Sequence, residues 1–265
     1  MTSPRPLPAG HGPASADLWS GPPDTAVPTP PPPVLAGAAP GSRLWVSRLI
    51  GALFLLGFLS YGVGSALANS VVGGAGFLPQ VSAHETTLLL GAFLMLVNSA
   101  VDVGKGVLFF PILEGHSKRT ALTYLSAMIV EVALLSVGAL ALLMIAPLAD
   151  RSADAGAIRA DWASTLGSLA VDANTMAYQL GELSLAIGCI FLCALLLRTR
   201  LIPRPLAIGG LIGYPLLALG SIAEVFGLHV GLALSIPGGL FEVALGCWLL
   251  VKGFEPAAYE AQPHR

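Results

Sequence analysis

The sequence predicts an all-α fold, a polytopic integral membrane bundle of six transmembrane helices. Of the 265 residues, 55 % are hydrophobic and only 11 % are charged, whereas a soluble domain carries about 25 % charged residues. The apolar residues also fall into six separate stretches, each close to the roughly 20 residues that a helix needs to cross a bilayer. These stretches cover residues 45–68, 87–113, 120–146, 173–197, 206–227 and 231–252.

Three segments are expected along the chain. Residues 1–42 hold 12 of the 21 prolines and almost nothing to bury, which predicts a disordered, Pro-rich cytoplasmic tail. A docking site of the PxxP type for a partner is the alternative interpretation of this tail. Residues 43–254 form the six-helix transmembrane domain, and residues 255–265 form a second, short cytoplasmic tail.

Lys and Arg residues are distributed unevenly over the predicted connections. With a cytoplasmic N-terminus, ten of them fall inside and only Arg151 and Arg159 fall outside, while Lys105 lies in the membrane. Cytoplasmic loops carry the excess of Lys and Arg, so both termini are expected in the cytoplasm. The ten inside residues are Arg5, Arg43, Arg48, Lys118, Arg119, Arg198, Arg200, Arg204, Lys252 and Arg265.

The longest predicted connection, residues 147–172, allows two interpretations. Ile158, Trp162, Leu166 and Leu169 recur at helical spacing within it. One interpretation is a short amphipathic helix that lies on the outer membrane surface. The other is an early start of the fourth spanning helix.

The fifth apolar stretch is rich in glycine, which permits close approach between helices. It contains Gly209, Gly213, Gly220 and Gly227, and Pro215 is expected to kink it. Glycine-rich faces of this kind predict contacts with a second copy of the chain or with another membrane protein. The lipid bilayer is the main expected partner, and the formal net charge of −2 gives no reason to expect nucleic acid.

Three segments resemble a known family when taken together. They are RLIGALFLLGF (Arg48 to Phe58), LIPRPLAIGGLIGY (Leu201 to Tyr214) and FEVALGCWLLVKG (Phe241 to Gly253). Their order and spacing resemble a bacterial membrane-protein family catalogued as domain of unknown function 4386, over roughly residues 45–254. The resemblance implies a multi-pass protein of the bacterial plasma (inner) membrane. Family members often carry an Arg shortly before the Glu of helix three, whereas Ile129 and Val130 precede Glu131 here.

The second apolar stretch contains an opposite-charge pair, Asp102 and Lys105, at a depth where a charge costs several kcal/mol. Asn98, Asp102 and Lys105 lie within about 60° of one helix face. Side chains lean toward the N-terminus of their helix, so Lys105 leans toward Asp102 and an intrahelical ion pair is expected. A pairing of Lys105 with Glu131 or Glu182 across the bundle stays open, and the pair is either purely structural or opens during function.

Four glutamates lie in four other apolar stretches. Glu131, Glu182 and Glu242 are expected near the bilayer centre, and Glu224 near the outer end of its helix. One lysine cannot neutralise all the deep carboxylates, so at least one is expected to be protonated, and a shared polar cavity is predicted. The candidate functional residues are Asn98, Asp102, Lys105, Glu131, Tyr178, Glu182 and Glu242.

The sequence contains no complete motif for catalysis or metal binding among those considered. His84 and Glu85 begin an HExxH pattern, but Leu88 stands where the second His is required. Cys189 and Cys193 are interpreted as core thiols. We therefore predict no catalytic residue, no metal and no cofactor. The leading hypothesis is a transporter or proton-coupled carrier of a small solute; the alternatives are an intramembrane lipid-modifying enzyme and a structural or regulatory membrane partner.

Overall fold

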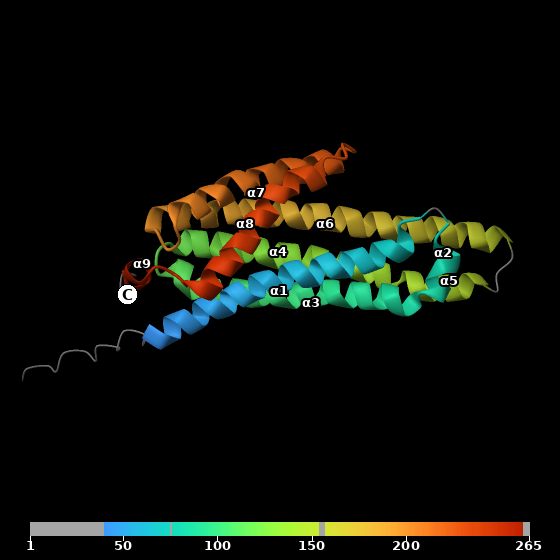
Figure 1. Ribbon diagram of the computed structural model, residues 1–265. Coiled ribbons are helices and arrows are strands. Elements are labelled where there is room, and N and C mark those ends of the chain that lie inside the picture. Colours follow the sequence, from blue (N-terminus) through green and yellow to red (C-terminus); the bar gives the residue numbers. More distant parts are fainter. Residues whose placement is uncertain (1–39, 75, 154–156, 262–265) are drawn as a thin grey trace, which may run out of the picture. The chain divides into compact units, whose positions relative to one another are not determined.

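The computed structural model describes residues 40–74, 76–153 and 157–261, and the regular structure in these ranges is entirely helical (Figure 1). This confirms the all-α prediction. The described helices are α1 (Pro40–Val72), α2 (Leu78–Ala83), α3 (Glu85–Glu114), α4 (Lys118–Leu143), α5 (Ile145–Ala153), α6 (Ala157–Thr199), α7 (Arg204–Val225), α8 (Gly231–Val251) and α9 (Pro256–Glu260). The predicted Pro-rich tail lies outside the described residues, except that α1 begins at Pro40, slightly before the expected boundary.

Six helical segments in the described part of the chain are long and apolar enough to cross a membrane, as predicted. They are α1, α3, α4 continued into α5, α6, α7 and α8. Tight connections after α3 and α6 reverse the chain direction, so neighbouring helices run antiparallel. We call the end that holds the first residues of α1, α4 and α7 the basic end, and the opposite end the far end.

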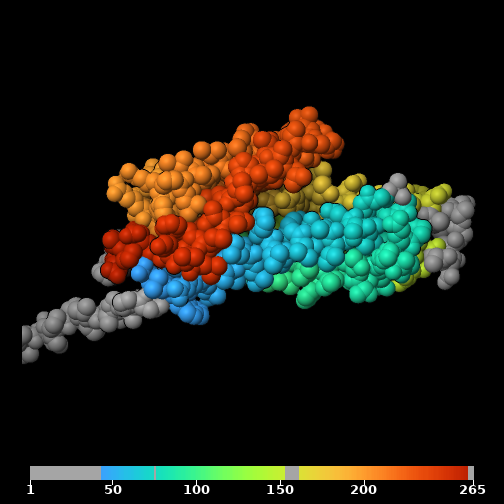
Figure 2. Space-filling model, in the orientation of Figure 1, coloured from blue at the N-terminus to red at the C-terminus, as the bar shows by residue number. Residues whose placement is uncertain are grey.

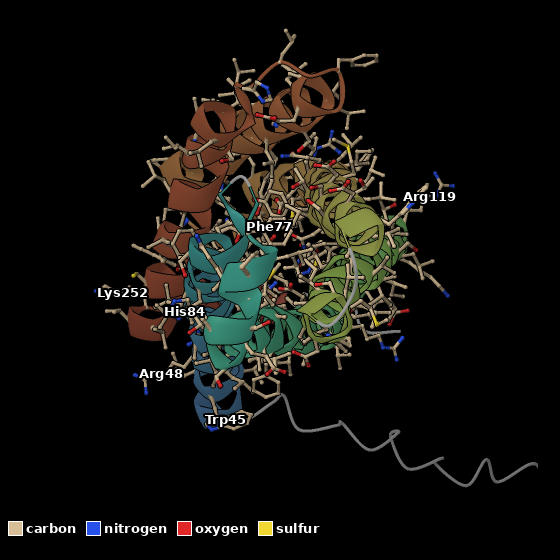
Figure 3. The ribbon with its side chains drawn as sticks, turned by 90° about the vertical axis from the view of Figure 1, so that its right-hand side faces the viewer. Trp45, Arg48, Phe77, His84, Arg119 and Lys252 are labelled. Atoms are coloured by element: carbon tan, nitrogen blue, oxygen red, sulfur yellow. The ribbon has the colours of Figure 1, made fainter. Side chains whose placement is uncertain are left out.

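The basic end is tied together by contacts between its connections. The Glu255 amide donates to the Leu201 carbonyl at 2.9 Å, and the Arg43 guanidinium donates to the Phe254 carbonyl. One ring nitrogen of His116 lies 3.1 Å from the Ala258 carbonyl oxygen, which ties α9 to the end of α3. Figure 3, viewed from the far end, shows Arg48, Arg119 and Lys252 pointing away from the bundle, where aqueous solvent or lipid headgroups can reach them.

Near the basic end, aromatic side chains fill the centre of the bundle. The Phe109 ring packs edge-on against Phe54, Tyr124 and Phe254, with centroid separations of 6.1, 5.8 and 5.8 Å. Each of these four side chains is at most 3 % exposed. We call these four residues the aromatic plug, because they belong to a buried apolar cluster that closes this end of the bundle.

The far end has its own apolar core, formed by the ends of α1, α3, α4 and α6 with α2 and α5. Phe77, which precedes α2, points into the bundle in Figure 3, and its ring lies against the backbone of α6 at Gly167. The helices α7 and α8 have 22 and 21 residues, whereas α6 has 43. At 1.5 Å per residue, α6 therefore extends well beyond its two shorter neighbours at the far end, as Figure 1 shows.

The predicted outer connection at residues 147–172 is helical on both sides of a short break. The surface-helix interpretation is wrong, and the early start of the fourth spanning helix is confirmed, because α6 is continuous from Ala157. Small residues form the face of α6 that packs against the bundle: Ala163 and Ala177 are buried, and Gly167 lies against the Phe77 ring. Three of the large apolar residues that suggested a surface helix, Trp162, Leu166 and Leu169, face outward instead and are 67, 50 and 62 % exposed.

Helix α8 approaches both α1 and α7 closely at glycines. A Cβ atom on Gly51 of α1 would lie 2.6 Å from the Gly246 carbonyl oxygen of α8. On α7, a Cβ atom on Gly213 would lie 2.8 Å from the Gly238 nitrogen of α8 and 2.9 Å from the Pro237 carbonyl carbon. Gly213 therefore packs within the chain against α8, and a Cβ atom on Gly210 of α7 would lie 2.5 Å from the Cys193 Sγ atom of α6.

Candidate functional site

A cavity of about 420 Å³ lies inside the bundle between α1, α3, α4, α6, α7 and α8. All seven candidate residues predicted from the sequence line it, although they come from four different helices. They are Asn98, Asp102, Lys105, Glu131, Tyr178, Glu182 and Glu242. The aromatic plug lies on its basic-end side, since Phe109 follows Lys105 by one turn of α3 and Tyr124 precedes Glu131 on α4.

The charge pair on α3 forms one wall of the cavity. The Lys105 Nζ atom lies 2.6 Å from Asp102 Oδ1, so the predicted intrahelical ion pair is confirmed. The Asn98 amide donates to the other carboxylate oxygen, Asp102 Oδ2, at 2.8 Å. Lys105 Nζ also lies 4.7 Å from the centroid of the Phe54 ring, a cation–π contact that joins the ion pair to the aromatic plug.

Glycine at position 57 lets α1 approach this polar group. A Cβ atom there would lie 3.0 Å from Asn98 Oδ1 and 3.7 Å from Lys105 Nζ. Both Asp102 and Lys105 are at most 5 % exposed. The pair is therefore enclosed by protein on its α1 side and faces the cavity on the other.

The three deep glutamates differ in their partners. Glu242 accepts a hydrogen bond from the Tyr214 hydroxyl at 3.1 Å, which links α8 to α7. Glu131 is 3 % exposed, and no residue that the structure describes forms a hydrogen bond with its Oε2 atom. Glu182 lines the cavity one helical turn after Tyr178, whose ring stacks on Tyr61 with a centroid separation of 5.2 Å.

The cavity holds more acidic than basic groups. Four carboxyl side chains line it, against the single ammonium of Lys105. A buried charge without a partner is costly, so the three glutamates need bound protons or a cationic ligand. Glu131 shows this need most directly, because one of its buried oxygens has no partner among the described residues.

Glu224 lies apart from the main cavity, near the far end of α7, as expected. It accepts a hydrogen bond from the Gly231 amide at 2.8 Å, and its Oε2 atom lies 3.5 Å from His229 Nδ1. A smaller cavity of about 170 Å³ reaches Glu224 and shares Tyr178 and Leu217 with the main one. The polar interior therefore continues toward the far end between α6, α7 and α8.

Sequence reasoning missed the contribution of α1. Gly57, Tyr61 and Ser65 recur at four-residue spacing and all line the cavity. This stripe of small and polar residues in an otherwise apolar helix was the available signal. Tyr214 was also missed, because its role depends on α8 lying beside α7.

The cysteines and the remaining acidic residues do not form a recognisable metal site. Cys189 and Cys193 are buried in the apolar cluster near the basic end. Within the described ranges, no three His, Cys, Asp or Glu side chains are grouped as ligands for a metal ion. The carboxyl, ammonium, amide and hydroxyl groups that line the cavity can exchange protons, pair charges and form hydrogen bonds.

These features define the class of the protein: a multi-pass helical membrane bundle with a polar cavity at its centre. The chain belongs to the family described as Domain of unknown function (DUF4386), whose model matches residues 49–253. The resemblance predicted from three sequence segments is thus confirmed over nearly the same range. No curated protein and no solved structure matches the chain.

Proposed function

We propose that this protein is a proton-coupled carrier of a small solute, with Asp102, Lys105, Glu131, Glu182 and Glu242 as its coupling site. One observation carries the proposal. These five ionisable side chains come from four helices and line one cavity in the middle of the bundle. Ionisable residues inside a membrane are expensive, and they mark substrate and proton pathways.

The asymmetry of the cavity supports a carrier more than an open channel. Toward the basic end it is closed by the aromatic plug, whose Phe109 and Phe254 rings are fully buried. Toward the far end it continues into the smaller cavity beside Ser221 and Glu224. In alternating access, the solute site of each end state is closed toward one side of the membrane, and this cavity is closed toward the basic end.

Proton coupling follows from the excess of carboxyl groups. A cation that enters the cavity favours ionised carboxylates, and its departure favours protonated ones, because opposite charges stabilise one another at short range. The groups facing this exchange are the four carboxyls, the Lys105 ammonium and the hydroxyls of Tyr61 and Tyr178. The ion pair of Asp102 and Lys105 then acts as the fixed part of the site, and Glu131 and Glu182 as the exchanging part.

We also propose an orientation of the bundle in the membrane. The basic end holds Lys118, Arg119, Arg198, Arg204 and Lys252, so we place it in the cytoplasm of a bacterium, with the protein in the plasma (inner) membrane. Reporter fusions at the C-terminus and at Gly156 are expected to report opposite sides of the membrane. Fusions that report the same side would contradict the six-span topology.

Coupled transport can be measured in vesicles that contain the purified full chain and a trapped pH-sensitive dye. We expect at least one member of a panel of organic cations, amino acids and sugars to change the internal pH when it is added outside. Glu131→Gln and Glu182→Gln should abolish this change, whereas Glu85→Gln, on an exposed residue at the start of α3, should preserve it. A panel that moves no protons in the unmodified protein would contradict the proposal.

A further inference from the structure

The main cavity reaches the lipid-facing surface between α1 and α8. These helices touch near the basic end, where Gly51 meets Gly246. Farther along, Phe58 of α1 and Ile236 and Leu232 of α8 line the cavity and are also 53, 54 and 82 % exposed. In Figure 2, α8 diverges from α1 toward the far end, and atoms of α6 are visible between them.

The depth of this gap places it within the hydrocarbon region. Phe58 lies 15 residues after Arg43, and Ile236 lies 15 residues before Val251. At 1.5 Å per residue, both are about 22 Å from the basic end, while the hydrocarbon core is about 30 Å thick. The gap therefore opens toward the acyl chains of the far leaflet.

The floor of the cavity has the opposite character from its mouth. Four carboxyl groups and one ammonium group lie there, and the buried Oε2 atom of Glu131 has no hydrogen-bond partner in the described part of the chain. Stacked Tyr61 and Tyr178 add aromatic surface to the cavity lining. Acidic groups beside aromatic rings are the surroundings in which an organic cation is bound, through charge and cation–π contacts.

We propose that the cavity binds an amphipathic organic monocation that enters from the far leaflet through the gap between α1 and α8. Its charged part lies against Glu131 and Glu182, and its apolar part lies against Phe58, Leu232 and Ile236 at the mouth. The cavity volume of about 420 Å³ is within the range of about 300–1,000 Å³ typical of sites for drug-sized ligands. This inference rests on the proposed function, since it names the solute class of the same site.

Two probes of equal shape and opposite charge test the solute class. Tetraphenylphosphonium and tetraphenylborate are titrated into lipid nanodiscs that hold the full chain, and empty nanodiscs supply the background. We expect tetraphenylphosphonium to bind at least about tenfold more tightly than tetraphenylborate, since only the cation gains charged contacts. Equal affinities, or tighter binding of the anion, would overturn the proposal without the use of any variant.

Variants test the floor and the mouth separately. Glu131→Gln is expected to weaken tetraphenylphosphonium binding about tenfold or more, and Glu85→Gln to leave it unchanged. Gly239→Leu fills the mouth, because a Cβ atom at Gly239 already lies 3.4 Å from the Phe58 ring, and it should slow association. Gly209→Leu is the matched control, because its Cβ site has no described atom within 4 Å apart from those of its own helix turn. An unchanged affinity in Glu131→Gln contradicts the binding site, and an unchanged association rate in Gly239→Leu contradicts the lateral entry.

The binding and transport experiments fail in different ways. Tetraphenylphosphonium binding that depends on Glu131, without proton movement in vesicles, would overturn the carrier and support the cation site. Proton movement driven only by sugars or amino acids, with no preference for the cationic probe, would support the carrier and overturn the solute class. The two proposals are therefore tested independently.

Discussion

Lys105→Met is expected to lower the free energy of unfolding by about 3–5 kcal/mol, because breaking a buried ion pair leaves its partner charge uncompensated. Asp102 is that partner, with its Oδ1 atom 2.6 Å from Lys105 Nζ. The loss should be large here because three further carboxyl groups line the same cavity without another basic side chain. Unfolding of the purified protein in mixed micelles at increasing fractions of denaturing detergent measures it.

A double-mutant cycle measures the interaction energy between Asp102 and Lys105 apart from the interactions of each residue with its surroundings. Asp102→Asn alone should also destabilise the protein, and Asp102→Asn with Lys105→Met should recover much of the loss, because replacing both partners is often close to neutral. Cycles of Lys105 against Glu131 and against Glu182 should show weaker coupling. Lys252→Met, on an exposed lysine at the basic end, is the control. Additive losses for Asp102 and Lys105 would mean that their contact does not stabilise the fold.

Gly51→Ala is expected to lower the free energy of unfolding by about 1–3 kcal/mol, the usual cost of overpacking a close contact. The added methyl group would lie 2.6 Å from the Gly246 carbonyl oxygen and 2.8 Å from the Leu250 nitrogen. Both neighbours are backbone atoms, so no side-chain rotation relieves the clash and α1 must move away from α8. Thermal unfolding in a mild detergent measures the effect.

The matched control for this substitution is Gly209→Ala on α7. Outside its own helix turn, its Cβ site has no neighbour within 4 Å among the described residues, and alanine is favoured over glycine inside a helix by about 0.5–1 kcal/mol. The control should therefore be neutral or slightly stabilising. Equal losses for the two variants would show that the contact between α1 and α8 is not what Gly51 is needed for.

The spanning helices and the acidic set could be predicted from the sequence for related reasons. A membrane helix must satisfy its backbone internally and be apolar over a minimum length, so hydropathy alone locates it. Within such a helix a charged residue must face the protein interior, which is why Asp102, Lys105, Glu131, Glu182 and Glu242 were expected to meet. The structure brings all of them to one cavity.

The parts that were not predicted depend on neighbours far away in the sequence. The far-end course of α6 follows from small residues such as Ala163 and Gly167 packing against the segment around Phe77, and small residues carry little hydropathy signal. The sequence does not mark Tyr61 as a candidate functional residue, because α1 has no charged residue near it. Its place in the site comes from stacking on Tyr178. The α1–α8 gap arises from the angle between two helices, which no local pattern encodes.

The close contact of Gly213 with Gly238 places two prolines at nearly the same level of the α7–α8 hairpin. Pro215 and Pro237 have no backbone N–H, so the helical ladder of each helix is already interrupted there. Bending at this double hinge therefore disrupts fewer backbone hydrogen bonds than bending elsewhere in the two helices. The segment beyond it carries Leu232 and Ile236, one side of the cavity mouth. Rocking of this segment toward α1 would close the mouth, while the acidic groups on α3, α4 and α6 stay in place.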